Sequence, residues 1–220
     1  MHYASGDRYE GAWQAGVRHG EGVLSLKGTG RHLRGRFEAG ALPTQGELRL
    51  PGGRLYRGVL HQGKPHGIGC FSWQQSGDVY RGCVENGRRS GQGTLTWADS
   101  QESYTGNWVD DEPFGTQDCH YRYAGGERYE GGWDAGRHAY GAMRYKDGRI
   151  LRGQFVHDAL PRLGTIVWPS GEKYEGPLRG GKLQLGFAPG VLPRQHAPGP
   201  TPRPGTLRVG HPGAARPRCR

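Results

Sequence analysis

A five-residue pattern returns eight times along this 220-residue chain, and no other feature limits the fold as strongly. Each copy has Tyr or Leu, any residue, Gly, any residue, and then a large apolar residue, as in residues 9–13. The copies are centred on Gly11, Gly35, Gly58, Gly82, Gly106, Gly131, Gly153 and Gly176, at intervals of 22 to 25 residues. Spacing this steady is typical of a repeat architecture rather than of a mixed globular core.

Residue alternation predicts the structure of one repeat. Tyr9, Gly11 and Trp13 are two residues apart, so they share one face of a strand. A second alternating run follows each pattern, as in residues 67–73, and a turn sequence such as Lys-Asp-Gly at residues 146–148 closes the repeat. Period two with turn glycines predicts one β-hairpin per repeat. We interpret the glycine inside each strand as room for an aromatic ring from the neighbouring strand.

The Tyr-x-Gly-x-Trp pattern, followed by Gly-x-Gly and an apolar pair, resembles the MORN repeat (membrane occupation and recognition nexus). The resemblance implies an all-β protein, an elongated single-layer twisted antiparallel sheet of about eight stacked β-hairpins. We expect the array to span residues 6–187, with repeats starting near residues 6, 30, 53, 77, 101, 126, 148 and 171. Residues 188–220 contain eight prolines and six arginines but no acidic residue, which predicts a disordered tail.

Several repeats depart from the pattern: the second and seventh begin with Leu33 and Leu151, and the eighth lacks a convincing second strand after Leu178. Two others depart in the Gly-x-Gly run. In the fifth repeat we expect Gln117 to stand where the second glycine of Gly-x-Gly is usual. In the sixth repeat Tyr140-Gly141 stands there instead, and we interpret it as one residue out of phase. Both departures predict local irregularity rather than a different fold.

The chemistry-bearing residues point away from catalysis. Cys70, Cys83, Cys119 and Cys219 form no CxxC motif, and no HExxH motif is present, so we expect neither a disulfide framework nor a metal site. The Gly-x-Gly pairs open strands rather than helices and therefore lack the helix dipole of phosphate loops. Asp110-Asp111-Glu112 is interpreted as a solvated hairpin loop rather than a metal site. We expect no enzyme activity and no cofactor.

The aromatic face of a single-layer sheet has no second layer to bury it, which predicts a protein-binding scaffold with an aromatic groove for a partner helix or extended peptide. The candidate partner-binding residues lie at mid-array and are Tyr56, Trp73, Tyr80, Trp97, Tyr104 and Trp108. The alternative is that these rings stack on the strand glycines and hold neighbouring hairpins together. The resemblance implies cytoskeletal or motor-protein partners, often in cilia. Without a signal peptide or an apolar span, we expect a cytoplasmic location.

The distribution of charge along the chain bears on the alternative binding partners. Net charge is +10, but residues 187–220 carry +6 of it. Residues 31–57 hold six Arg against two Glu, so an anionic membrane or phosphoinositide is the alternative partner. Residues 90–121 hold six acidic residues and no Lys or Arg, which argues against nucleic acid. Unpaired backbone groups at the sheet ends keep a homodimer open as a further alternative.

Overall fold

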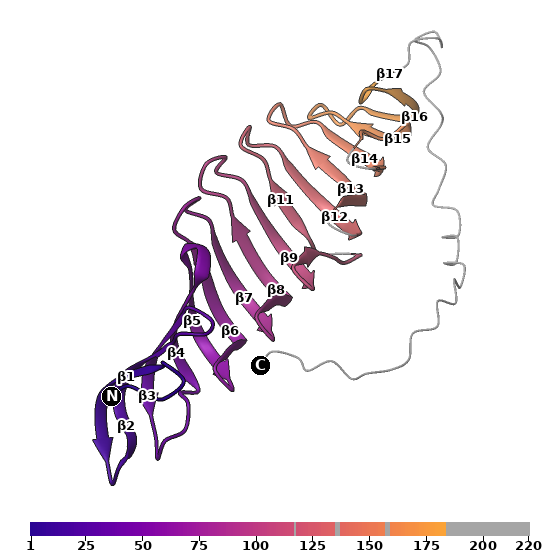
Figure 1. Ribbon diagram of the computed structural model, residues 1–220. Helices are drawn as coiled ribbons and strands as arrows, with labels where there is room; N and C mark the ends of the chain where they lie inside the picture. The colour runs from indigo at the N-terminus through magenta and orange to yellow at the C-terminus, as the bar shows by residue number, and fades with distance from the viewer. Residues whose placement is uncertain (117, 135–136, 157–158, 184–220) are drawn as a thin grey trace.

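The computed structural model describes residues 1–116, 118–134, 137–156 and 159–183. The predicted tail at 188–220 and the last four residues of the predicted array lie outside these ranges. Within them the chain forms a single open antiparallel sheet of hairpins, and the strands follow one another in chain order along an elongated, twisted ribbon (Figure 1). The all-β prediction from the repeat pattern is therefore confirmed.

Most strands are five to ten residues long, and a single 3-10 turn, Pro51–Gly53, interrupts the described β structure. The strands are β1 Arg8–Gln14, β2 Val17–Leu26, β3 Arg31–Phe37, β4 Gln45–Leu50, β5 Arg54–His61, β6 Lys64–Trp73, β7 Val79–Glu85, β8 Arg88–Thr96, β9 Ser103–Val109, β10 Glu112–Pro113, β11 His120–Arg122, β12 Arg128–Asp134, β13 Arg137–Arg144, β14 Ile150–Gln154, β15 Leu163–Val167, β16 Lys173–Arg179 and β17 Lys182–Leu183. Among the described segments, no helix is long and apolar enough to cross a membrane.

The strand glycines face one another across most of the described hairpins. Gly58 pairs with Gly69 in the β5–β6 register, and Gly131 pairs with Gly141 in the β12–β13 register. A Cβ atom on Gly58 would lie 2.5 Å from the Cα atom of Gly69, and one on Gly141 would lie 2.5 Å from the hydroxyl of Tyr129. The prediction that these glycines make room for a ring is confirmed at the second glycine of four pairs in repeats that begin with Tyr, namely Gly22, Gly69, Gly93 and Gly141. At the first, the space is also taken by the backbone of the facing strand.

Both edges of the ribbon are made of turns with positive φ. Hairpin tips such as Gln62-Gly63 and Asn86-Gly87 have two successive residues at positive φ, as a type I′ turn requires. Each expected repeat start also falls on a residue with positive φ: Gly6, Gly30, Gly53, Gly77, Gln101, Gly126, Gly148 and Gly171. Turn glycines therefore set the repeat length, and Gln101 is the exception among them.

The structure corrects the sequence interpretation of the fifth repeat. It places Cys119, not Gln117, beside Gly106, where a Cβ atom on Gly106 would lie 2.9 Å from the Cys119 sulfur. Gln117 itself lies outside the described residues. The register shifts because the chain leaves β9 after β10, so that the Gly115 amide donates to the Trp133 carbonyl before β11 pairs with β9.

The sixth repeat has the expected one-residue offset. Gly141 faces Gly131 from ten residues further along the chain, whereas Gly69 faces Gly58 from eleven. The register shift between Gly131 and Trp133 absorbs the difference, so the glycines still face each other.

The two faces of the sheet differ. One, here called the aromatic face, carries the Tyr or Leu of each repeat and the buried hydrophobic residues. The opposite face carries ion pairs between neighbouring strands. Glu47 pairs there with Arg49 at 3.1 Å and with Arg57 at 2.9 Å, and Arg144 pairs with Glu130 at 2.9 Å. A binding surface on the aromatic face therefore depends on which of its side chains stay accessible to solvent.

Candidate protein-binding surface

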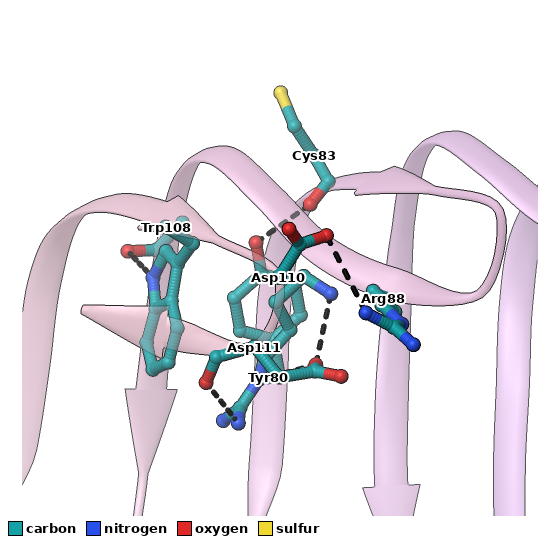
Figure 2. A network of polar contacts seen from close by, with 8 residues as sticks. Tyr80, Cys83, Arg88, Trp108, Asp110 and Asp111 are labelled. Carbon is teal, nitrogen blue, oxygen red and sulfur yellow. Dashed lines mark hydrogen bonds and ion pairs between the residues drawn. The ribbon is translucent and has the colours of Figure 1, made fainter. Parts of the chain in front are cut away.

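Four of the six predicted binding residues are in the core. Tyr56, Tyr80 and Tyr104 are 0% exposed and Trp108 is 2% exposed. The Tyr56 and Tyr80 rings lie across the glycine of the facing strand instead of projecting from the sheet, whereas Cys119 takes the place of that glycine beside Tyr104. In all three, the hydroxyl donates to the carbonyl three residues later. The distances are 2.8 Å from Tyr56 to Val59 and 2.7 Å from Tyr80 to Cys83 (Figure 2). These four side chains thus belong to the alternative in which the rings hold the hairpins together.

Burial has a measurable chemical consequence for these tyrosines. It raises the pKa of Tyr56 to about 12, and it also raises the pKa of Tyr104 and of Tyr9. A phenol in this environment stays protonated and keeps donating its hydrogen bond over the whole physiological pH range. The tyrosines are consequently fixed structural donors rather than groups available to a ligand.

From Tyr80 to Phe155 the buried rings form a continuous series of edge-to-face contacts, which we call the aromatic ladder. Trp108 lies between two tyrosines, with ring centroids 5.5 Å from Tyr80 and 5.0 Å from Tyr104. Tyr104 in turn contacts Trp133 at 4.9 Å, and Tyr129 contacts Phe155 at 5.2 Å. Each such pair is stabilising by about 0.5–1.5 kcal/mol beyond the area it buries. The ladder therefore joins the fourth to the seventh repeat.

Polar contacts at the hairpin tip reinforce the ladder around Trp108. Its indole nitrogen donates to the Gly93 carbonyl at 3.1 Å, and the Arg89 guanidinium lies 4.2 Å from the ring centroid. Arg89 also contacts the Asp111 carboxylate at 3.0 Å, while Arg88 pairs with Asp110 at 3.7 Å. Asp110 and Asp111 form a hairpin turn, as the sequence predicted, and their charges are paired with arginines of the preceding repeat.

Trp73 and Trp97, the other two predicted residues, stay half-buried on the aromatic face. They belong to a larger set of aromatic residues that occupy the same position in successive repeats. Each is the last residue of a strand, or the residue directly after it, and each stands just before a repeat-start turn. This set, which we call the edge aromatic row, is Trp73, Trp97, Tyr123, Tyr145 and Trp168. Sequence reasoning missed its last three members, although each stands before a turn glycine just as Trp73 does.

Backbone hydrogen bonds hold every member of the row at the same place. The amide of the aromatic residue donates across the repeat-start turn to the carbonyl of the residue two before the next Tyr or Leu. The bond is 3.0 Å from Trp73 to Asp78, 3.0 Å from Trp97 to Glu102 and 2.9 Å from Tyr145 to Arg149. The row therefore runs along the edge of the sheet, crossing the strands, with one ring per repeat.

Carboxylates alternate with the rings of this row. Asp78 accepts a hydrogen bond from the Ala98 amide at 2.9 Å. Glu102 accepts from the Tyr121 hydroxyl at 2.7 Å and from the Ala124 amide at 3.3 Å. These bonds orient the carboxylates between successive hairpins, and each side chain stays half-exposed. The central part of the row therefore combines apolar rings with negative charge.

The aromatic face changes sign toward the N-terminal end. A groove of about 390 Å³ is lined there by cations from four different strand or turn segments, together with Leu50. These cations are Arg31, Arg54, Lys64 and Arg88, and the Asp111 carboxylate also lines the groove. The six arginines of residues 31–57 do not act as one patch, because Arg49 and Arg57 lie on the opposite face with Glu47. Because side chains alternate between the two faces along a strand, these arginines are divided between the two faces of the sheet.

These features define a β-hairpin repeat scaffold with a buried aromatic ladder and a half-open aromatic row. In the described part of the chain, no group of three or more His, Cys, Asp or Glu residues is placed to hold a metal ion. The family model of the MORN repeat matches residues 9–27, 56–77, 80–102 and 129–148. The chain is a MORN repeat protein, as the sequence pattern predicted. No curated protein sequence matched the chain.

Proposed function

We propose that this protein is a non-catalytic scaffold that holds a partner protein along the edge aromatic row. The observation that carries the proposal is the repetition of one half-buried ring per repeat on a face whose core is already complete. Aligned apolar side chains that remain partly open on a rigid support are typical of protein-binding surfaces. A partner helix or extended peptide lying across the strands would cover them.

The proposal revises the set of binding residues. Trp73 and Trp97 remain partner-contacting residues, and Tyr123, Tyr145 and Trp168 join them. Tyr56, Tyr80, Tyr104 and Trp108 support the surface from beneath. A cytoplasmic location with cytoskeletal or ciliary partners remains part of the proposal and rests on the resemblance to other MORN proteins.

A photo-crosslinking experiment tests this surface. We expect a benzoylphenylalanine placed at Trp97 to crosslink a protein partner in cells. The same group at Thr94 is the control, because Thr94 lies on the opposite face, where its hydroxyl contacts Thr105 at 2.9 Å. Crosslinks at Thr94 without crosslinks at Trp97 would place the partner on the opposite face and refute the proposal.

A second candidate function is supported by the cationic groove. Arg31, Arg54, Lys64 and Arg88 converge around Leu50 and would suit anionic headgroups at a membrane surface. Flotation with vesicles containing phosphatidylserine tests it. Arg31→Gln with Arg54→Gln should reduce flotation, whereas Arg49→Gln with Arg57→Gln on the opposite face should not. Equal loss for both pairs would argue against a role for the groove.

Two further alternatives stay predictions. A homodimer through the sheet ends would use the free edge of β1, and part of that edge is paired within the chain, since the Tyr9 amide donates to the Met1 carbonyl at 2.9 Å. Nucleic acid remains an unfavourable partner because the middle of the array is acidic, as residues 90–121 show in the sequence.

A further inference from the structure

The central part of the edge aromatic row has a chemical pattern that specifies its partner more closely, on the assumption that the row is the binding surface proposed above. Across neighbouring strands the order is Trp73, Asp78, Trp97, Glu102, Tyr123, Glu127 and Tyr145. Each of the three carboxylates therefore stands between two aromatic residues. A ring beside a carboxylate suits a guanidinium or ammonium group, which stacks on the one and pairs with the other.

The chain itself uses this position for cations in the flanking repeats. Arg54 lies two residues before Tyr56, and Arg149 lies two residues before Leu151, the same place that Asp78 has before Tyr80. The Arg54 guanidinium lies 5.2 Å from the Phe71 ring centroid, and that of Arg149 lies 5.3 Å from Tyr145. In these two flanking repeats, arginine thus stacks on an aromatic ring of this face.

Between these two arginines the column is negative. Asp78, Glu102 and Glu127 are half-exposed, and among the described residues no Lys or Arg forms an ion pair with any of them. On the opposite face, by contrast, Glu47 and Glu130 each pair with an arginine. The hydrogen bonds to Asp78 and Glu102 use only part of the capacity of each carboxylate, which accepts about four. Three acceptor positions therefore remain for cations supplied by another chain.

The spacing of the carboxylates favours an extended partner. Successive carboxylates are two strands apart, which is about 9.6 Å at a strand spacing of about 4.8 Å. A polyproline II segment repeats every three residues, over about 9.3 Å. In an α-helix, residues seven positions apart are separated by about 10.5 Å along the axis. Across the three carboxylates, a helix would therefore depart from their spacing by more than a polyproline II segment would. An extended segment therefore matches the column best.

We propose that Asp78, Glu102 and Glu127, with the rings beside them, bind a polyproline-type segment of a partner protein that carries Arg or Lys at every third residue. Each cation stacks on a ring of the edge aromatic row and pairs with one carboxylate. Arg54 and Arg149 bound the site by repelling cations beyond these three positions.

The probe for this proposal is a labelled (Pro-Pro-Arg)4 peptide, titrated into the full chain and followed by anisotropy and tryptophan fluorescence. Its matched isomer has the same composition with the four arginines contiguous. We expect the periodic peptide to bind about tenfold more tightly than the isomer, since only it places each charge-assisted contact in register. We also expect (Pro-Pro-Glu)4 not to bind. Equal affinity of the two arginine isomers would overturn the proposal, and so would tighter binding by a helical peptide with arginine at every seventh residue.

A variant pair locates the binding. Glu102→Gln should weaken the periodic peptide about fivefold or more, because the amide keeps the acceptor for Tyr121 but removes the charge. Glu130→Gln, on the opposite face, is the control and should leave affinity unchanged. Unchanged affinity in Glu102→Gln with an intact melting temperature would overturn the assignment. If crosslinking from Trp97 still succeeded then, the scaffold proposal would stand and only the cationic partner would be lost.

Discussion

At the residue scale, the fold depends on a pairing between tyrosine and glycine. The Tyr80 ring lies flat because Gly93 on the facing strand has no side chain, and the hydroxyl then reaches the Cys83 carbonyl at 2.7 Å. The glycine that weakens an isolated strand by its flexibility is here required by a close contact. Neither residue can change alone without exposing or displacing the other.

This pairing predicts an asymmetric response to adding one methyl group. Gly93→Ala should destabilise the protein by about 2–3 kcal/mol, because the new Cβ atom would collide with the Tyr80 hydroxyl and ring. Gly28→Ala is the control, since nothing lies within 4 Å of a Cβ atom there, and it should change stability by no more than about 0.5 kcal/mol. Urea denaturation measures both. Similar values for the two variants would disprove the contact.

The raised pKa of Tyr56 predicts loss of stability in alkali. In the unfolded chain the phenol ionises near pH 10, whereas in the fold its pKa is about 12 because of burial. The stabilisation is complete below pH 10 and is lost as pH rises from about 10 to 12. Tyr56→Phe should be less stable at pH 7, having lost the bond to Val59, but should show a smaller decrease between pH 8 and 11. Denaturation curves at these pH values provide the comparison.

At the scale of the element, turns rather than strands set the repeat length. The repeat-start turns carry glycine at positive φ in seven of eight repeats, and Gln101, with φ of 58°, is the exception. Left-handed backbone disfavours residues with a side chain by about 1 kcal/mol. The Gln101 side-chain amide recovers part of this by donating to the Ala98 carbonyl.

Gln101→Gly should therefore stabilise the protein by about 0.5 kcal/mol, the backbone gain minus the lost exposed hydrogen bond. Gln75→Gly is a suitable control, since Gln75 lies in the corresponding region of another turn without positive φ. That change should be neutral or destabilising. Chemical denaturation at pH 7 distinguishes the two, and destabilisation by Gln101→Gly would show that the side-chain contact outweighs the backbone term.

At the scale of the whole molecule, two aromatic sets run across several repeats of the sheet. The aromatic ladder joins the fourth to the seventh repeat through contacts between neighbours, so stability there is expected to be a sum of nearest-neighbour terms. The edge aromatic row shares the same face but contributes fewer buried contacts. Because the edge aromatic row is separate from the aromatic ladder, we expect substitutions in the row to leave the buried core intact.

Glycine periodicity predicted the hairpins and the face on which the rings lie. It did not separate Tyr80 from Trp97, because alternation places both on the aromatic face while burial depends on ring orientation. Tyr80 bends over a facing glycine, whereas Trp97 lies at the edge, beyond Leu95. The shift to Cys119 was also hidden, since it arises from the detour of Gly115 to Trp133 rather than from any local motif.

The division between ladder and row is the central claim, and the unfolding free energies of two tryptophan variants test it most directly. Trp108→Ala should cost about 3–5 kcal/mol, because it removes a buried ring that contacts Tyr80 and Tyr104. Trp97→Ala should cost only about 1 kcal/mol, since much less of its surface is withdrawn from water. Equal losses in the two variants, or a larger loss for Trp97→Ala, would contradict the account.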